Sequence, residues 1–376
     1  MQLKCNGIKE GKNGLGIVVY EGNVAGVFTQ NRFKSPSVVV TEEHIKNGFI
    51  EGIIANSGNA NAFTGKKGYR NAKRMCQLLA EKLKTDTENI AVASTGVIGV
   101  QLNMEWIESR FEKVYAGLGK DIMAFAKSIM TTDRFPKFAR YEEEFKIYGV
   151  CKGAGMIHPN MATMLAFIFT DARFEAVELK ELLRNAVRYS FNVISVDGET
   201  STNDMVLLVA KGECEVGRER FLKGLKEVCL NLAKQIVRDG EGATKIIKVT
   251  IVNAKSEEEA FRGARTVVAS NLVKTAVFGN DPNWGRIIAS LGYSEIEVNE
   301  ELDLKLLGHK NGYRVGEVEL VRNGVGLGNE DFAREIMKRS DEIEFVIDLK
   351  IGNCKGYAYG CDLTYDYVRI NSEYTT

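Results

Sequence analysis

A threonine that follows a glycine-rich loop, Thr163, could act as a nucleophile if the chain were cut directly before it. A threonine hydroxyl is a weak nucleophile at its own pKa and needs an adjacent base. If Thr163 attacked the carbonyl of Ala162, the peptide would rearrange to an ester, and water would then sever the chain. A free α-amine ordinarily has a pKa of about 8, so nucleophile and base would belong to one residue.

The residues around Thr163 are of the types that would place it at the start of a buried strand. Gly153 and Gly155 permit positive φ angles, and Pro159 biases the residue before it towards extended geometry. Residues 165–169 form a short continuous apolar run, which is typical of a strand buried on both faces. On these residues alone, an ordinary turn from loop to strand is the better interpretation.

Three other polar segments could serve acyl transfer. Thr95 and Gly96 follow an apolar run and could offer a hydroxyl and an N–H group to a developing oxyanion, but on these residues alone a simple turn that closes the strand is the better interpretation. Lys152 could bind a substrate carboxylate, but most lysines are solvated surface residues. The segment 56–62 ends a strand before a helix, where an anion site and a plain N-cap fit equally well.

Long motifs along the chain resemble those of the glutamate N-acetyltransferase (ornithine acetyltransferase) family of arginine biosynthesis. The run KGAGMIHPNMATMLAFIFTDA at 152–172 closely matches the self-cleaving segment of that family. The other matching motifs, in the same order, are NSGNANAFTG (56–65), STGVIG (94–99), MTTD (130–133), SVDGETSTND (195–204), RDGEGATK (238–245), GNDPNWGRI (279–287) and CDLTYDYVRINSEYTT (361–376). Several long motifs in order are far more specific than a single glycine pattern.

The resemblance implies a ping-pong mechanism. In that family the chain is cut between the residues that match Ala162 and Thr163, and the threonine then carries the acetyl group. Thr95 and Gly96 match the oxyanion-hole residues. The acetyl group would move from N2-acetylornithine to L-glutamate without a cofactor, and some family members also accept acetyl-CoA.

The resemblance also implies a set of substrate-binding residues: Thr131, Lys152, Thr163, Glu241, Asn371 and Thr376. Both acetylornithine and glutamate present a carboxylate, for which a lysine is a suitable partner. We therefore hypothesise a clamp in which Lys152 binds the carboxylate and Glu241 faces the amino group. Chain ends usually fray, so the roles of Asn371 and Thr376 rest on the resemblance.

The composition gives no reason to expect a polyanion or a membrane as partner. The 376 residues include 50 Lys and Arg against 50 Asp and Glu, so the net charge is zero. We find no apolar run long enough to span a bilayer and no signal-peptide core, and we expect a cytoplasmic protein. Seven scattered cysteines favour free thiols, and three histidines without ligand spacing give no reason to expect a metal site.

Apolar patterns predict alternating strands and helices along most of the chain. The predicted strands are 15–20, 24–28, 37–41, 50–55, 205–210 and 246–252. The predicted helices are 42–47, 68–83, 105–130, 176–190, 219–237, 257–270 and 330–340. The last residues, 366–376, are predicted as a strand with a polar tail.

The resemblance implies an α/β (α+β) fold, a layered αββα sandwich of the aminopeptidase/ornithine-acetyltransferase type with a smaller C-terminal α+β subdomain from about residue 280 to 376. Self-cleavage would give an α chain, 1–162, and a β chain, 163–376, which we expect to associate as a heterotetramer of two α and two β chains. The main alternative is an N-terminal-nucleophile aminopeptidase or amidohydrolase of the same fold. A binding protein that never cleaves itself is the other.

Overall fold

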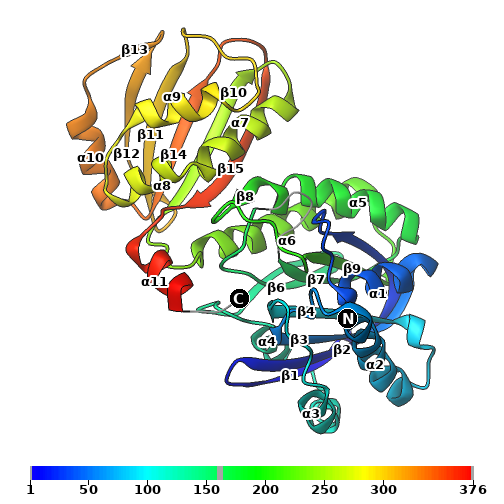
Figure 1. The fold of residues 1–376 in the computed structure, drawn as a ribbon. Helices are drawn as coiled ribbons and strands as arrows, with labels where there is room; N and C mark the ends of the chain where they lie inside the picture. The colour runs from blue at the N-terminus through cyan, green and yellow to red at the C-terminus, as the bar shows by residue number, and fades with distance from the viewer. Residues whose placement is uncertain (1, 159–163, 374–376) are drawn as a thin grey trace. The chain divides into compact units, whose positions relative to one another are not determined.

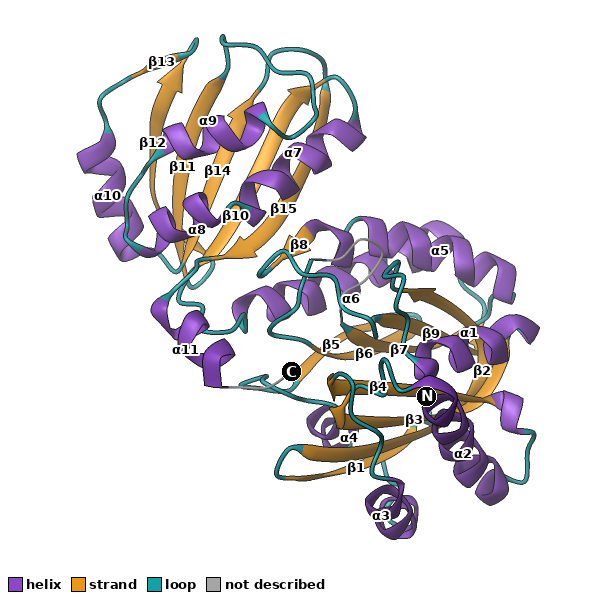
Figure 2. Cartoon of the chain, in the orientation of Figure 1, coloured by secondary structure: helices purple, strands orange, loops and turns teal. Residues whose placement is uncertain are grey.

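The computed structural model of the protein is a mixed α/β structure with two β-sheets (Figures 1 and 2), which confirms the expected fold class. It describes residues 2–158 and 164–373. The described chain forms two compact units, of which the first comprises 2–192 with 199–236 and the second 193–198 with 237–373. The subdomain boundary expected near residue 280 lies inside the second unit.

The first unit is organised around a mixed sheet. Its strands lie in the order β4-β3-β2-β9-β7-β6-β5, and β1 pairs with β2 beside this path. Their bounds are β1 Lys4–Glu10, β2 Asn13–Phe28, β3 Phe49–Asn59, β4 Ile90–Val97, β5 Lys137–Glu142, β6 Lys146–Lys152, β7 Leu165–Ala172 and β9 Met205–Cys214.

Helices follow or connect most of these strands. Their bounds are α1 Pro36–His44, α2 Gly65–Leu83, α3 Met104–Ala116, α4 Ile122–Ser128, α5 Ala176–Arg188 and α6 Arg218–Arg238, with short 3-10 turns η1 Ile45–Asn47, η2 Thr87–Asn89 and η3 Phe191–Val193. The helix predicted for 176–190 is confirmed as α5, and its apolar stripe of Leu179, Leu182, Leu183 and Ala186 is buried.

The long strand β2 shows how the sheet of the first unit is covered on both faces. Side chains alternate between the two faces of a strand, and Ile17 and Val18 accordingly belong to different apolar clusters. Ile17 shares its cluster with Met75 of α2 and Phe111 of α3. Val18 shares its cluster with Phe125 of α4. The sheet is therefore a buried layer between these helices.

The buried strand predicted after Thr163 is confirmed as β7. Residues 165–169 are all buried, and β7 lies between β9, which is parallel to it, and β6, which is antiparallel. Leu165 at the start of β7 pairs with Lys152 at the end of β6 and with Met205 at the start of β9. The sheet edge at which β7 begins therefore also carries Lys152.

The second unit contains a separate sheet in the order β13-β12-β11-β14-β10-β15-β8. Its strands are β8 Ile194–Ser195, β10 Ile246–Ala254, β11 Asp303–Lys310, β12 Tyr313–Arg322, β13 Val325–Gly326, β14 Glu342–Asp348 and β15 Cys354–Cys361. Its helices are α7 Glu257–Ala269, α8 Asn271–Phe278, α9 Trp284–Gly292, α10 Glu330–Arg339 and α11 Tyr365–Glu373.

Helices α7 to α10 pack on one face of this second sheet (Figure 2). Strand β10 explains the arrangement, because Ile247, Val249 and Ile251 point into the shared apolar cluster while Lys248 and Thr250 alternate with them. The apolar face of the sheet is therefore covered by these helices, while the β10 side chains Lys248 and Thr250 lie on the opposite face.

The prediction of a strand at 37–41 is wrong, because this segment belongs to helix α1. Ser35 caps the helix by accepting a hydrogen bond from the N–H of Val38, and Pro36 occupies the first turn. Consecutive β-branched residues favour strands locally, but here Val38 and Val40 are buried on the helix. The cap and the tertiary burial outweigh the local preference.

The single helix predicted for 105–130 is also wrong, since the structure has two helices separated by residues 117–121. Gly117 ends α3, and Asp121 starts α4 by accepting a hydrogen bond from the N–H of Met123 at 2.9 Å. A glycine followed by a capping aspartate interrupts a helix even when apolar periodicity continues.

The chain end predicted as a strand, 366–376, is helical over its described part, which belongs to α11. Thr364 provides the cap, because its hydroxyl accepts the N–H of Tyr367 at 3.3 Å. No residue of α11 is buried, so no apolar face signals this helix in the sequence.

Candidate active site

The structure describes six of the nine predicted site residues, and these fall into two sets. Ala162, Thr163 and the substrate-binding position Thr376 lie outside the described residues. The other six are divided between the units: Thr95, Gly96, Thr131 and Lys152 belong to the first, and Glu241 and Asn371 to the second.

Thr95 and Gly96 lie near the end of β4, beside the parallel strand β3. Gly96 has a φ angle of +131°, and a Cβ at this position would come within 2.3 Å of the backbone carbon of Gly58. Only glycine fits there, since L side chains rarely adopt this φ and the neighbouring backbone leaves no room. The strand end therefore brings a buried threonine hydroxyl next to an obligatory glycine.

Lys152, at the end of β6, reaches Thr95 across the site. Its ammonium group donates a hydrogen bond to the Thr95 hydroxyl oxygen at 3.2 Å, and both residues are buried. A lysine ammonium can only donate, so the Thr95 oxygen must accept in this bond. The hydroxyl hydrogen of Thr95 is therefore not used in this bond and can be donated to an oxyanion, as an oxyanion hole requires.

Asp133 is a buried carboxylate in the loop after α4, and it joins the segments that carry Thr131 and Lys152. It accepts hydrogen bonds from the backbone N–H groups of Gly153 at 2.7 Å and Thr131 at 2.9 Å, and from the ammonium of Lys137 at 2.6 Å. Burial would raise the pKa of this carboxyl, but Lys152, Lys137 and these hydrogen bonds outweigh it and lower the pKa to about 2.

Lys9 of β1 is a second lysine near Lys152, and no pattern in the sequence singles it out. Its ammonium donates to the hydroxyl of Ser57 at 2.7 Å and to the carbonyl of Met130. Burial and the charge of Lys152 lower the pKa of Lys9 to about 8, against the opposite effect of Asp133. A single lysine on a strand carries no sequence signal for such a contact, because its partners lie far away along the chain.

Lys9 leads to a prediction for the dependence of stability on pH. Its ammonium has a lowered pKa of about 8 in the folded protein, against an ordinary pKa of 10.5, so between these values the unfolded chain binds more protons. Stability contributed by this group therefore rises with pH across that window. We expect the free energy of unfolding of the wild type to gain about 1 kcal/mol relative to Lys9→Met between about pH 8 and pH 10, after allowing for solvent screening of a partly exposed group.

Urea unfolding of both proteins at the two pH values measures this difference. Lys4→Met, at an exposed position of the same strand, is the matched control and should follow the wild type. If the free energies of unfolding of the wild type and Lys9→Met depend on pH in the same way, the pKa of Lys9 is not lowered in the folded protein.

Asn203 is another residue that sequence reasoning did not select. Its side-chain amide donates to the backbone carbonyls of Ala60 at 2.6 Å and Ser94 at 2.8 Å. These bonds connect three of the motifs found in the sequence, 56–65, 94–99 and 195–204, at the end of β4. Asn203 therefore supports the strand end that carries Thr95.

In the second unit, the structure brings Glu241 and Asn371 together although they are far apart in sequence. The Asn371 side-chain amide donates to the Glu241 carboxylate at 2.8 Å. Gly242 has a φ angle of +70°, and Thr364 donates to its carbonyl at 2.8 Å, which holds the loop against the start of α11. Glu241 itself is buried. The two predicted substrate-binding residues thus form one contact.

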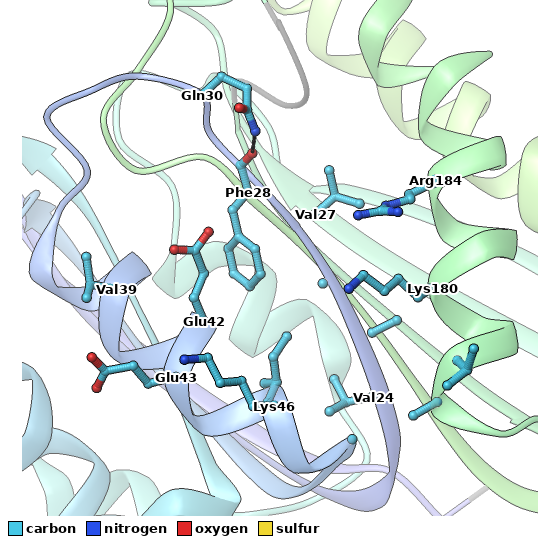
Figure 3. Close-up of a pocket in the computed structure, with 16 residues that line it drawn as sticks. Val24, Val27, Phe28, Gln30, Val39, Glu42, Glu43, Lys46, Lys180 and Arg184 are labelled. Atoms are coloured by element: carbon cyan, nitrogen blue, oxygen red, sulfur yellow. Dashed lines mark hydrogen bonds between the residues drawn. The ribbon is translucent and has the colours of Figure 1, made fainter.

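A cavity of about 700 Å³ in the first unit is lined by none of the predicted site residues (Figure 3). Lys180 and Arg184 of α5 lie on one side of it, and Glu42 and Lys46 lie on the other (Figure 3). Glu42 already pairs with Lys34 at 2.6 Å. A smaller cavity of about 240 Å³ lies closer to the site, since Ser57, Gly58 and Val97 line it next to the end of β4.

The described part of the chain contains no group of three or more His, Cys, Asp or Glu side chains placed to hold a metal ion. All seven cysteines are among the described residues, and no disulfide bond joins any two of them. Within residues 2–158 and 164–373, we find no helix that is long and apolar enough to cross a membrane.

Comparison with known proteins identifies relatives along the whole chain. The model of the ArgJ family matches residues 1–376. A protein of Archaeoglobus fulgidus named arginine biosynthesis bifunctional protein ArgJ is 52% identical over 375 residues, which cover 99% of this chain and 97% of that protein. A glutamate N-acetyltransferase of Methanocaldococcus jannaschii is 47% identical over 396 residues, which cover 100% of this chain and 97% of that protein.

A solved structure is similar to part of the fold. The crystal structure of the arginine biosynthesis bifunctional protein ArgJ of Bacillus halodurans is 42% identical in sequence and matches with a TM-score of 0.52. The match covers 56% of this chain and 100% of the chain in that structure.

Proposed function

This chain belongs to the ArgJ family, and we propose that it is a glutamate N-acetyltransferase of arginine biosynthesis, which moves an acetyl group from N2-acetylornithine to L-glutamate. One relative that matches along the whole chain is named for arginine biosynthesis, and another is named a glutamate N-acetyltransferase. The structural observation that supports the proposal most directly is the hydrogen bond from Lys152 to Thr95, because it leaves a hydroxyl donor beside Gly96. Acyl transfer requires such donors where charge develops on the carbonyl oxygen.

Self-cleavage produces the catalytic group. The Thr163 hydroxyl attacks the carbonyl carbon of Ala162, the peptide C–N bond breaks, and an ester forms between the two residues. Water hydrolyses this ester, which leaves a carboxylate on Ala162 and a free α-amine and hydroxyl on Thr163. The α-amine, whose pKa is ordinarily about 8, can then accept the hydroxyl proton.

Transfer proceeds in two half-reactions. The Thr163 hydroxyl attacks the acetyl carbonyl of N2-acetylornithine, its proton passes through the α-amine to the departing amine of ornithine, and an acetyl ester of Thr163 remains. The amine of glutamate then attacks this ester, which releases N-acetylglutamate and restores the hydroxyl. In both half-reactions Thr95 and Gly96 donate hydrogen bonds to the oxyanion, which lowers the barrier.

The fate of the acetyl group separates transfer from the hydrolase alternative. An aminopeptidase or amidohydrolase would release acetate from N2-acetylornithine whether or not glutamate is present. A transferase releases ornithine at a steady rate only when glutamate takes up the acetyl group. Measuring ornithine, acetate and N-acetylglutamate with and without glutamate tests the proposal, and acetate as the main product would overturn it. The names of the relatives favour transfer.

We extend the proposal to the assembly and its requirements. The fragments 1–162 and 163–376 stay associated after cleavage, as a heterotetramer of two α and two β chains in the cytoplasm. The reaction needs no cofactor. Acetyl-CoA is a further candidate acetyl donor, and an assay with acetyl-CoA and glutamate alone tests whether this enzyme uses it.

Glu241→Gln is expected to weaken the binding of both amino-acid substrates. Under the clamp hypothesis, the Glu241 carboxylate faces the substrate amino group while Lys152 binds the carboxylate. A glutamine can still accept the hydrogen bond from Asn371, so the substitution removes mainly the charge. We expect the KM for N2-acetylornithine and for glutamate to rise about 10- to 100-fold, because hydrogen bonds to charged groups contribute about 1.5–3 kcal/mol.

Steady-state kinetics with each substrate measure this effect. Asn371→Ala removes the contact but keeps the Glu241 charge, and it should raise KM less than Glu241→Gln. Unaltered kinetics with both substrates in Glu241→Gln would exclude the clamp.

A further inference from the structure

The buried carboxylate Asp133 is not among the predicted site residues, yet it connects two of them. We propose that Asp133 is a positioning residue of the reaction, which keeps Lys152 protonated beside Thr95 and thereby fixes the Thr95 hydroxyl as the oxyanion donor. This inference rests on the proposed acyl-transfer function and assigns a further residue to it.

The Asp133 carboxylate forms hydrogen bonds with two backbone segments, one at Gly153 and one at Thr131. One carboxylate oxygen accepts the backbone N–H of Gly153 and the Lys137 ammonium, and the other accepts the N–H of Thr131. Gly153 directly follows Lys152 and has a φ angle of +151°, a conformation that favours glycine. The carboxylate therefore fixes the backbone on the C-terminal side of Lys152 at the point where the chain leaves β6.

Asp133 is also the negative charge around which three cations gather. Lys137 of β5 forms an ion pair with it at 2.6 Å, with both side chains fully buried. Lys152 of β6 is close enough to stabilise the ionised carboxylate, and Lys9 of β1 interacts electrostatically with both Asp133 and Lys152. Without the carboxylate, these ammonium groups would repel one another in a poorly solvated site.

The protonation state of Lys152 determines the direction of its bond with Thr95. A protonated ammonium donates, so the Thr95 hydroxyl accepts it and keeps its own hydrogen for the oxyanion. A neutral lysine amine has a lone pair and can accept the Thr95 hydrogen instead. The oxyanion would then lose one donor, and losing one donor typically slows acyl transfer about 10²- to 10³-fold.

The test is the pH dependence of kcat/KM for N2-acetylornithine in purified, self-cleaved protein. We expect kcat/KM to fall at alkaline pH, where Lys152 loses its proton, and we call this fall the alkaline decline. In Asp133→Asn the lost charge should move the alkaline decline to lower pH by about 1 unit or more, because an opposite charge at short range shifts a pKa by about 1–3 units. In Lys137→Met the decline should move to higher pH, because Lys152 loses a repelling cation and keeps the carboxylate. Shifts of opposite sign are not expected from a general loss of stability.

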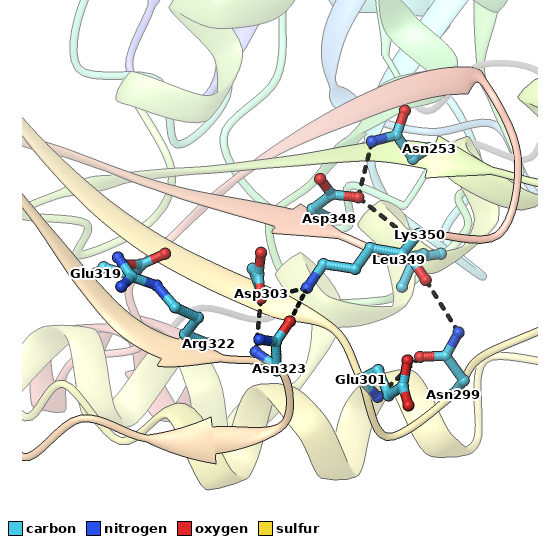
Figure 4. Close-up of polar contacts among 10 residues, drawn as sticks. All are labelled: Asn253, Asn299, Glu301, Asp303, Glu319, Arg322, Asn323, Asp348, Leu349 and Lys350. Carbon is cyan, nitrogen blue, oxygen red and sulfur yellow. Dashed lines mark hydrogen bonds and ion pairs between the residues drawn. The ribbon is translucent and has the colours of Figure 1, made fainter.

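Asp303 of the second unit provides the matched control (Figure 4). Its carboxylate accepts the Lys350 ammonium and the backbone N–H of Asn323, each at 2.7 Å, so its partners are of the same two kinds. Asp303→Asn should lower stability without moving the alkaline decline. A shift as large as that of Asp133→Asn would show that the effect is not specific to the site.

The remaining outcomes separate the inference from the function on which it depends. If the wild type fails to transfer acetyl groups, the proposed function is wrong. If the wild type transfers but Asp133→Asn and Lys137→Met keep its alkaline decline, or both move it in one direction, the positioning role is wrong. Should Asp133→Asn fail to fold, Lys137→Met decides with Asp303→Asn as its control, because Lys137→Met removes a cation, keeps the carboxylate and should move the decline to higher pH, and an unmoved decline would refute the positioning role.

Discussion

Thr163→Ala is expected to leave the protein as one uncut polypeptide and to abolish acetyl transfer. The variant lacks the hydroxyl that would attack Ala162, so the ester never forms and no free α-amine appears at residue 163. Both the nucleophile and its base are then missing. Removing a catalytic nucleophile costs at least about 10⁴-fold in rate, and here we expect activity below detection.

Intact-mass measurement of the purified wild type and variant tests this expectation. The wild type should give two fragments, the second beginning with threonine, and Thr163→Ala should give only the full-length chain. Thr163→Ser is the matched control, because it keeps a hydroxyl and should still cleave and transfer at a lower rate. A wild type that transfers acetyl groups as a single intact chain would contradict the mechanism.

Thr95→Ala is expected to slow self-cleavage and acetyl transfer together. Both reactions pass through a tetrahedral intermediate with charge on a carbonyl oxygen, and the same donors would stabilise it in each. The loss of one donor typically costs about 10²- to 10³-fold in kcat, and we expect an effect of this size on both rates. The effect should fall on kcat more than on KM, since the bond strengthens only as the charge develops.

Two neighbouring variants make the test specific. Ser94→Ala removes a hydroxyl from the adjacent residue of β4, but the Ser94 hydroxyl pairs with that of Ser37, so both rates should stay near those of the wild type. Thr95→Ser keeps the hydroxyl that accepts from Lys152 and should retain most of the activity. Unchanged rates of cleavage and transfer in Thr95→Ala would remove Thr95 from the oxyanion hole.

These variants also distinguish the roles of Thr95 and Asp133. Thr95→Ala should lower the rate at every pH, because the donor is absent whatever the charge of Lys152. Asp133→Asn should lower the rate most at alkaline pH, where Lys152 loses its proton. Comparing the two pH profiles therefore shows whether Asp133 acts through the Thr95 hydroxyl.

Much of the local structure could be predicted from the sequence, because it depends on residues close together in the chain. The continuous apolar run at 165–169 is the buried strand β7, and the stripe that includes Leu179 and Leu183 is buried on α5. Predictions failed where a short-range cue was overruled. The β-branched residues of 37–41 suggested a strand, but the Ser35 cap and burial on a helix decided otherwise.

The amino-acid sequence by itself determined which chemistry is available: a threonine after a glycine-rich loop, a Thr95–Gly96 pair after an apolar strand, and the motifs that place them in one family. Only the tertiary structure decided which charges act on them. Lys9 contacts Ser57 and Met130, and Asp133 binds Gly153, across separations of 48, 121 and 20 residues. Electrostatic interactions depend on distance in space, and spacing along the chain does not reveal which ammonium groups will share one buried carboxylate.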